Sequence, residues 1–260
     1  MIATRPRSPL VALLAALSLM ATVVYVAGAT APASASACPA VDPTTFAVTP
    51  APSPGVDWSG CDLSYADLTS ANLANASLNS ANLTEATFTG ANLNNASLSG
   101  AQLTGVISGF IVGDPAALPT NWELLSGYLV GPGADLRFAA LAGVDLTSSH
   151  LGGANLSHAD LGNAMLIGTD LRYADLTYTN VGGVLTNGTD MRDTNMYGAV
   201  LQGAWLSGAD LRSVASGGIT GTPSALPTSW RLANGFLVGP TARLFGANLS
   251  ELDLSGVDFT

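Results

Sequence analysis

The sequence contains no lysine and has few positive charges of any kind. Lysine and arginine together number 8, against 18 aspartates and glutamates, which gives a formal net charge of −10 at pH 7. A protein that binds nucleic acid through the phosphate backbone needs a basic surface. A Walker-type phosphate loop is excluded as well, because its lysine is missing. We therefore expect no direct nucleic-acid binding.

Histidine is almost as scarce. The chain has two, His150 and His158, and their spacing supplies no third or fourth ligand for a metal ion. No G-x-S-x-G motif is present, and the two histidines stand in no arrangement that would activate a serine. These absences favour a non-enzymatic protein with no catalytic residue, no metal site and no cofactor.

Residues 1–37 have the features of a secretory signal peptide. Arg5 and Arg7 give a positive start, 10–28 is an uncharged and mostly apolar run, and 35–37 reads Ala-Ser-Ala, a typical cleavage site. Two alternatives remain: an uncleaved membrane anchor, since the run is nearly long enough to span a bilayer, and a lipid-modified Cys38. We expect an exported bacterial protein that is secreted or associated with the cell envelope, with membrane contact only through this segment.

The only two cysteines, Cys38 and Cys61, both come after the expected cleavage site. In an oxidising compartment such a pair favours a disulfide over a metal or catalytic site. The leader between them, 38–60, is rich in proline and glycine and has no periodicity. A bridge here would tie the leader to the first repeat unit and stabilise the fold by roughly 3 kcal/mol in the loop-entropy picture.

From Cys61 onward the chain repeats in units of five. A small residue opens each unit, a polar residue comes second, and leucine stands at the centre, as in ADLTS, ANLAN and ASLNS. The first and third residues are two apart, so their side chains point to the same face of an extended segment. Asparagine, aspartate, serine and glycine dominate the other positions, which is the composition of turns. Units this short bury their leucines only by stacking on copies of themselves.

The repeat also predicts how many units close one coil. The triplet Asp-Leu-Arg begins at Asp170 and at Asp210, and Asp-Met-Arg begins at Asp190 between them. The triplets therefore recur every 20 residues, which is every fourth unit. In a four-unit coil these aspartates lie above one another at about 4.8 Å, and a parallel column of arginines offsets their repulsion. We interpret the set as a paired surface charge ladder, not a binding site. Its members are Asp170, Arg172, Asp190, Arg192, Asp210 and Arg212.

The motif A-[DN]-L-x-x resembles the pentapeptide-repeat family, whose fold is all-β: a right-handed quadrilateral parallel β-helix, or solenoid. With this resemblance, the sequence divides into seven parts. These are a signal peptide (1–37), the leader (38–60), repeat block 1 (61–105), insert 1 (106–133), repeat block 2 (134–213), insert 2 (214–241) and repeat block 3 (242–260).

The two inserts are copies of each other in the same register, and each carries a β-hairpin signal. Asn234-Gly235 is a type I′ turn pair in the second insert, and Ser126-Gly127 takes its place in the first. One hypothesis makes the hairpin aromatics a binding surface for a glycan or a partner. The alternative, which we favour, is that each tryptophan packs its hairpin onto the coil. The residues concerned are Trp122, Tyr128, Trp230 and Phe236.

One column of block 2 is apolar where the repeat otherwise places aspartate or asparagine. Met165, Leu185 and Trp205 occupy the outward second position of every fourth unit, and Ile167 lies nearby. An outward apolar strip on an acidic protein calls for an explanation. The hairpin of insert 2 could cover it, a partner or second copy could bind it, or it could stay exposed.

The function we predict is that of an exported structural or interaction protein whose partner is an unknown protein or surface polymer. The family resemblance implies an alternative, a DNA mimic that binds DNA gyrase or topoisomerase IV and protects against quinolones. A third candidate is an ice- or surface-binding solenoid, because Ser64, Thr84 and Thr104 recur at the same four-unit spacing. We also expect a homodimer through the C-terminal coil, whose last edge is open to pairing.

Overall fold

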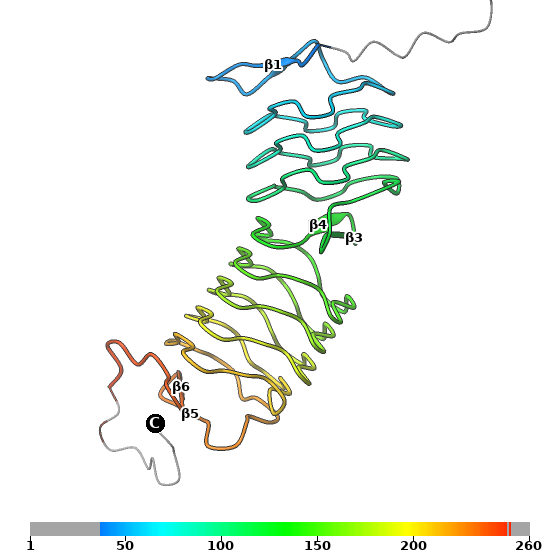
Figure 1. Cartoon of the computed structure of the whole chain (residues 1–260). Coiled ribbons are helices and arrows are strands. Elements are labelled where there is room, and N and C mark those ends of the chain that lie inside the picture. Colours follow the sequence, from blue (N-terminus) through cyan, green and yellow to red (C-terminus); the bar gives the residue numbers. More distant parts are fainter. Residues whose placement is uncertain (1–36, 249, 251–260) are drawn as a thin grey trace, which may run out of the picture. The chain divides into compact units, whose positions relative to one another are not determined.

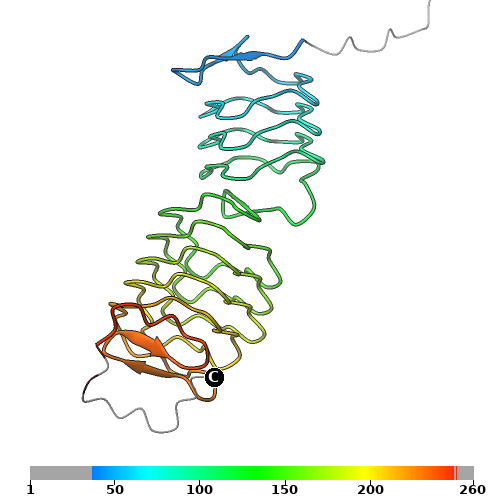
Figure 2. The same ribbon diagram turned by 60° about the vertical axis from the view of Figure 1, so that its left-hand side comes forward.

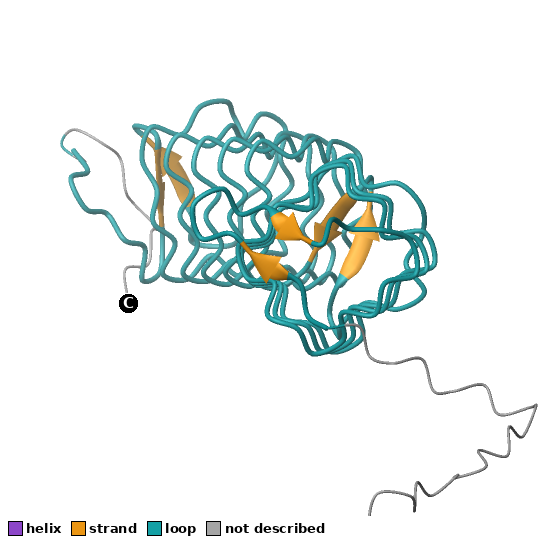
Figure 3. Ribbon diagram, turned by 90° about the horizontal axis from the view of Figure 1, so that it is seen from above, coloured by secondary structure: helices purple, strands orange, loops and turns teal. Residues whose placement is uncertain are grey.

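The computed structural model describes residues 37–248 and residue 250. The expected signal peptide, apart from Ala37, lies outside the described residues, as does most of repeat block 3. Figure 3 shows loops and turns over most of the described chain, with a few short strands and no helix in that part. The strands form three antiparallel pairs: β1 (Ala40–Val41) with β2 (Val48–Thr49), β3 (Glu123–Leu125) with β4 (Tyr128–Val130), and β5 (Arg231–Ala233) with β6 (Phe236–Val238).

The rest of the described chain forms stacked coils joined by isolated parallel bridges (Figures 1 and 2). Asn155 pairs with Asp135 above and with Asp175 below, so each partner stands four units away along the chain. The N–H of Asn155 donates to the carbonyl of Ala134 at 2.9 Å, and the N–H of Leu156 donates to the carbonyl of Asp175 at 2.8 Å. Each unit contributes one bridged residue, its second. The extended part of a unit is therefore shorter than a strand.

The turn chemistry of the repeat explains its polar residues. In the unit that begins at Cys61, the carboxylate of Asp62 accepts a hydrogen bond from the N–H of Ser64 at 3.1 Å, which stabilises the next bend. The N–H of Ala66, the first residue of the next unit, donates to the carbonyl of Leu63 at 3.1 Å. The fifth residue, Tyr65, has a φ of 62°, a left-handed conformation that asparagine and glycine adopt readily. This geometry accounts for the asparagines and glycines that recur at the fifth position.

The first and third residues of each unit point inward and make the core. Leu156 and Leu176, at equivalent positions in successive coils, are both fully buried. The buried residues form two clusters, one from Val48 to Leu129 and one from Val130 to Leu237. Strand β4 contributes to both clusters, and Trp122 packs against both. Insert 1 therefore joins the two cores.

Several units of block 2 place threonine or serine at the inward first position, where alanine is usual. The hydroxyl of Thr179 donates to the carbonyl of Leu156 at 2.7 Å, and that of Thr169 donates in the same way to Leu146. Thr186, which takes the central leucine position, donates to the carbonyl of Trp205 at 2.8 Å. Each of these buried hydroxyls has a backbone acceptor in an adjacent coil, which removes the penalty of burying it.

The ladder of bridges continues beyond the boundary predicted at residue 105. Ile107, Val112 and Ala117 bridge Thr87, Asn92 and Ser97. The first part of insert 1 therefore completes a coil, although its sequence no longer has the leucine pattern. Insert 2 behaves in the same way, since Thr220 and Ala225 bridge Val200 and Trp205. A bridge needs only backbone groups, so it persists where the side-chain motif is lost.

Both inserts attach their hairpins by the same contacts. The N–H of Leu129 in β4 donates to the hydroxyl of Ser108 at 2.9 Å, and the N–H of Leu237 in β6 donates to Ser216 at the same distance. In the turns, Ser126 and Gly127 both have positive φ, as do Asn234 and Gly235. Two left-handed residues in succession are the requirement of a type I′ turn, which explains the choice of residues.

The leader, predicted to be irregular up to residue 60, already stacks as a repeat unit over 56–60, since Asp57 bridges Ser77 and Trp58 is buried. Its earlier part is held to the first coil by two further links. A disulfide joins Cys38 to Cys61, with the Cα atoms 5.4 Å apart. Further along, Ala47 bridges Asp67, and the N–H of Asp67 donates to the carbonyl of Phe46 at 2.8 Å. The irregular leader therefore caps the start of the described ladder.

Candidate functional site

The outward apolar column of block 2, here called the apolar strip, consists of Met165, Ile167, Leu185 and Trp205. Parallel bridges join Met165 to Leu185 and Leu185 to Trp205, so the column runs along the stacking direction of the coils. Ile167 is 36% exposed, Leu185 43% and Trp205 53%, whereas Met165 is half-buried. The strip therefore presents aliphatic and aromatic surface to solvent.

The strip borders a shallow hollow of about 380 Å³. Ile167, Leu185 and Trp205 form its apolar wall, and Asn187 and Ser207 add polar groups. The floor includes Thr186, whose hydroxyl already donates to a backbone carbonyl. The hollow is thus a small concave apolar surface with a polar edge, which is the arrangement that accommodates an apolar side chain of another molecule.

One sequence interpretation, that the hairpin of insert 2 covers the strip, disagrees with the structure. Strand β6 packs elsewhere: Leu237 is bonded to Ser216, and a side chain at Gly217 would meet the ring of Phe236. Insert 2 meets the end of the apolar column where Ala225, which lies outside the hairpin, bridges Trp205. Its contacts with Ser216 and Gly217 hold the hairpin at this other place on the coil. Among the described residues, the hairpin therefore leaves the strip exposed to solvent.

The hairpin tryptophans are packing residues in the structure. Trp230 is 8% exposed and belongs to the core cluster, and Trp122 is half-buried between the two clusters. A Cβ added at Gly239 would overlap the Trp230 ring, and one added at Gly131 would overlap the Trp122 ring. Each indole therefore rests directly on a glycine. This burial favours packing over the hypothesis that the two tryptophans form a binding surface.

The other two aromatics of the hairpins are half-buried as well. Tyr128 lies against Gly109, and its hydroxyl accepts a hydrogen bond from the N–H of Ala140 at 3.1 Å. Phe236 occupies the equivalent place against Gly217 in the second insert. Both rings fix their hairpins to the coil, because each fills the space left by a glycine.

The charge ladder of block 2 is fully paired. Arg172 contacts Asp170 at 2.7 Å in its own coil and Asp190 at 3.6 Å in the next. Arg192 repeats the arrangement with Asp190 at 2.5 Å and Asp210 at 3.5 Å, and Arg212 ends it by contacting Asp210 at 2.6 Å. Hydrogen bonds from these arginines hold the pKa of each aspartate below its usual range. The ladder is a neutralised surface.

The histidines stack into other columns. His150 bridges Asp170, and the ring of His158 lies between Phe138 and Tyr178, 5.1 Å from each. Over residues 37–248, no group of three or more histidine, cysteine, aspartate or glutamate side chains could hold a metal ion. The same residues contain no helix that is long and apolar enough to cross a membrane.

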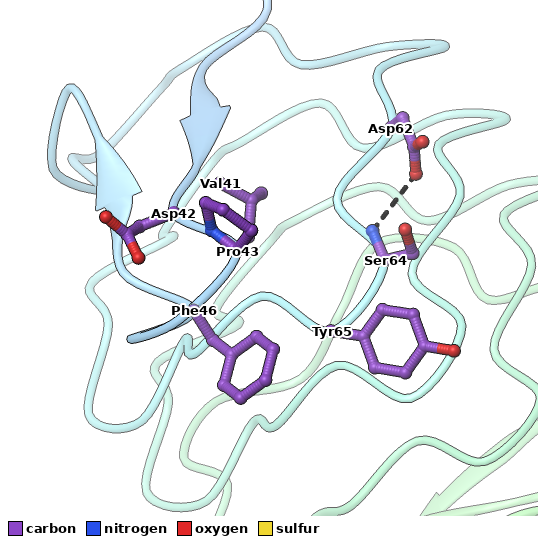
Figure 4. A pocket seen from close by; sticks show the side chains of 7 residues that line it. All are labelled: Val41, Asp42, Pro43, Phe46, Asp62, Ser64 and Tyr65. Atoms are coloured by element: carbon purple, nitrogen blue, oxygen red, sulfur yellow. Dashed lines mark hydrogen bonds between the residues drawn. The ribbon is translucent and has the colours of Figure 1, made fainter.

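Sequence reasoning missed one feature, a cavity of about 520 Å³ between the leader and the first coil (Figure 4). Phe46 and Asp42 come from the leader, and Tyr65 and Asp62 come from the first coil. A signal was present in the sequence, because Tyr65 is a large ring at a fifth position where most units have serine, asparagine or glycine. Its partner Phe46 lies in a segment without periodicity, so the pairing could not be read from the repeat.

Comparison with known proteins gives a clear family match. The family model for pentapeptide repeats matches with 8 copies, over residues 54–79, 71–107, 133–164, 149–185 and 174–212. These segments span just over half of the chain and coincide with the bridged coils. A comparison with curated proteins found no relative of the chain.

Several solved structures are similar. One is HetL, a pentapeptide repeat protein involved in heterocyst differentiation regulation from the cyanobacterium Nostoc sp. Strain PCC 7120, with 30% identity, a TM-score of 0.18, and coverage of 74% of this chain and 67% of that chain. Another is trypsin-treated QnrB1, a plasmid-mediated fluoroquinolone resistance protein, with 13% identity, a TM-score of 0.30, and coverage of 64% and 82%. A pentapeptide repeat protein from the Arabidopsis thaliana thylakoid lumen has 23% identity, a TM-score of 0.19, and coverage of 58% and 68%.

Proposed function

Because the chain belongs to the pentapeptide repeat family, we propose that it is an exported, non-enzymatic interaction protein that binds a protein partner through the apolar strip. The family implies a right-handed β-helix, and its members are generally structural or interaction proteins. We also infer that each coil is four-sided, because every bridge within block 2 joins residues that stand four units apart. The first part of each insert continues the coil, and the second part carries the hairpin.

The observation that carries the proposal is the exposure of Leu185 and Trp205 on a chain that is otherwise polar and acidic at most of its outward positions. Contact with water raises the free energy of apolar side chains, and a partner that covers them lowers it again. The hollow beside Trp205 offers a pocket for one anchoring side chain, which is how a small interface obtains most of its affinity. The charge ladder is paired within the chain, so its charges are less available to a partner than the side chains of the strip.

Export is supported by two features. Residues 1–37 have the composition of a signal peptide, and the cysteine pair Cys38–Cys61 is bridged. Structural disulfides persist in oxidising compartments outside the cytoplasm. Fractionation of the native host tests this part directly: we expect the protein in the medium or the envelope, and its recovery from the cytoplasm with reduced cysteines contradicts export.

Site-specific crosslinking tests the strip. A photoreactive amino acid replaces Leu185 in the full chain, expressed in the native host, and Tyr173 serves as a matched control because it is exposed at a different column. We expect one crosslinked species at Leu185, absent at Tyr173, and its loss when Trp205→Ala is added. Equal crosslinking at the two positions, or no dependence on Trp205, contradicts a specific interface.

A second candidate comes from the charge of −10, since an acidic coil can compete with DNA for a DNA-binding enzyme. This candidate is the gyrase- or topoisomerase-binding alternative. The paired ladder reduces its support, because arginines neutralise the aspartates that repeat most regularly. Addition of the purified chain to a gyrase supercoiling assay tests it: inhibition, or protection from a quinolone, favours DNA mimicry, and unchanged supercoiling removes it.

A further inference from the structure

The cavity between the leader and the first coil, here called the leader cavity, is a built feature of the fold. The disulfide Cys38–Cys61 and the bridge from Ala47 to Asp67 hold the leader against the coil on either side of the loop that carries Phe46. The volume of about 520 Å³ lies within the range of pockets that hold small molecules. The cavity is therefore preformed, and it is separate from the apolar strip.

Two aromatic rings form its apolar part. The ring centroids of Phe46 and Tyr65 are 6.3 Å apart with an angle of 33° between the planes, and Figure 4 shows the rings next to each other. Phe46 is 44% exposed and Tyr65 is 50% exposed. The face of an aromatic ring carries negative potential and attracts a cation placed within about 6 Å of its centre. Val41 and Pro43 add aliphatic surface beside the rings.

Two aspartates line the cavity, one from each wall, and Figure 4 shows the carboxylate of Asp42 turned away from the two rings. Asp42 accepts hydrogen bonds at Oδ1 from Thr44 and Thr45, and Asp62 accepts at Oδ1 from Ser64 and from the Asn82 side chain. In both aspartates, Oδ1 is the acceptor of these hydrogen bonds. Both residues are exposed and line the cavity. The same bonds hold the pKa of each carboxyl below its usual range, the Thr44 hydroxyl contributing most at Asp42 and the Ser64 side chain at Asp62.

These carboxylates differ from the paired ladder of block 2 in one respect. From residue 37 to residue 136 the chain has no lysine, arginine or histidine, so this part of the sequence supplies no cationic side chain to balance them. Aromatic faces and carboxylates both favour a positive charge, and they meet here in one cavity. We propose that the leader cavity binds a small organic ammonium ion, with its nitrogen over the Phe46 and Tyr65 rings and Asp62 as the main counter-charge.

Calorimetric titration of the full chain with choline tests this proposal. We expect saturable binding that weakens as salt is added, and no binding of 3,3-dimethylbutan-1-ol, which has the same shape without the charge. Tyr65→Ala and Asp62→Asn should each weaken binding by about fivefold, the size expected for one cation–π or one exposed charge contact. Failure of both choline and butylammonium to bind, or equal binding of the neutral alcohol, overturns the proposal.

Matched controls exclude indirect effects. Tyr173→Ala removes an exposed tyrosine at the same unit position, and Asp145→Asn alters a carboxylate with the same turn hydrogen bond, from the N–H of Thr147. Both variants should bind choline as the unaltered chain does, and so should Trp205→Ala, which separates this site from the apolar strip. If the control variants lose as much choline affinity as Tyr65→Ala does, the assignment of the site to the leader cavity is overturned.

A quaternary ammonium can belong to a soluble molecule or to a lipid headgroup. Flotation with phosphatidylcholine vesicles, compared with phosphatidylglycerol vesicles, distinguishes the two sources once choline binding is established. Flotation that needs phosphatidylcholine and Tyr65 identifies the headgroup as a ligand. Choline binding without flotation identifies a soluble cation, and either result agrees with the chemistry of the cavity.

Discussion

Replacement of Leu176 by alanine tests the stacked core most sharply. Leu176 is fully buried at the centre of a unit, between equivalent residues of the coils before and after it, and its N–H donates to the carbonyl of Asn195 at 2.7 Å. The substitution leaves that backbone bond intact and removes only side-chain volume. A leucine-to-alanine change at such a site costs about 3 to 5 kcal/mol, because the transfer free energy is lost and a cavity remains.

The matched control is Leu185→Ala, two units later along the chain but at an outward position that is 43% exposed. This change should alter the free energy of unfolding by less than about 1 kcal/mol, since much of the side chain is already in water. Urea unfolding of the full chain, monitored by circular dichroism and tryptophan fluorescence, measures both. With a slope of about 2 kcal/mol per molar urea, Leu176→Ala lowers the midpoint by about 2 M. Equal midpoint shifts for the two variants would refute the inward and outward assignment.

Three further outcomes depend on individual contacts. Gly239→Ala should destabilise the protein by more than about 2 kcal/mol in the same urea assay, because its new methyl group would overlap the Trp230 ring. Reduction of Cys38–Cys61 should lower the free energy of unfolding by about 3 kcal/mol and abolish choline binding, since the leader is then held less firmly. Stability should fall as the pH drops below about 4, and Asp190→Asn should make that fall shallower in acid titrations monitored by circular dichroism.

The sign of the acid effect comes from the pKa of the ladder carboxyls. Arginine hydrogen bonds lower the folded-state pKa of Asp190 below its unfolded value, so the folded protein gains stability above the unfolded pKa and loses it as pH falls through the folded one. An acid profile that Asp190→Asn leaves unchanged contradicts this role.

For Gly239 the control is Gly143→Ala, where no atom lies within 4 Å of the added Cβ and only the strain of a positive φ remains. For the disulfide, the account is contradicted if the reduced chain has the same free energy of unfolding and the same affinity for choline as the oxidised chain.

The regular part of the fold could be predicted from the sequence because each repeat unit packs against copies of itself. One short motif therefore specifies both a residue and its neighbours. The recurrence of Asp170, Asp190 and Asp210 predicts a coil of four units, and the backbone bridges have that spacing. The motif could not show how far the ladder continues. Ile107 and Val112 bridge the coil above although their sequence has lost the pattern, because the bridges depend on backbone groups alone.

Tertiary contacts decide where the hairpins of the inserts pack on the coil, and the sequence pattern does not reveal these contacts. The turn residues Asn234 and Gly235 predict a hairpin, but its place is decided by how Phe236 fits against Gly217 and by the hydroxyl of Ser216. These contacts keep it away from the apolar strip. The sequence therefore predicted the strip itself, and it left open what covers it.

The leader cavity could not be predicted because its walls come from unlike segments. Phe46 belongs to an irregular loop, and the disulfide and the bridge from Ala47, which lie on either side of that loop, bring it beside Tyr65. The expected C-terminal dimer contact, like the signal peptide up to residue 36, lies outside the described residues and stays a prediction. A periodic sequence predicts its own stacking well, and it predicts poorly what irregular segments add to it.

A crystal structure offers the most direct test of the central claim, that each coil closes after four units. The quantity to measure is the distance between the Cα atoms of Leu156 and Leu176. Stacked coils require about 4.8 Å, the spacing of neighbouring strands, with both side chains in the core. A structure in which Leu156 lies beside a residue three or five units away, or in which the two leucines point to opposite faces, would contradict the account.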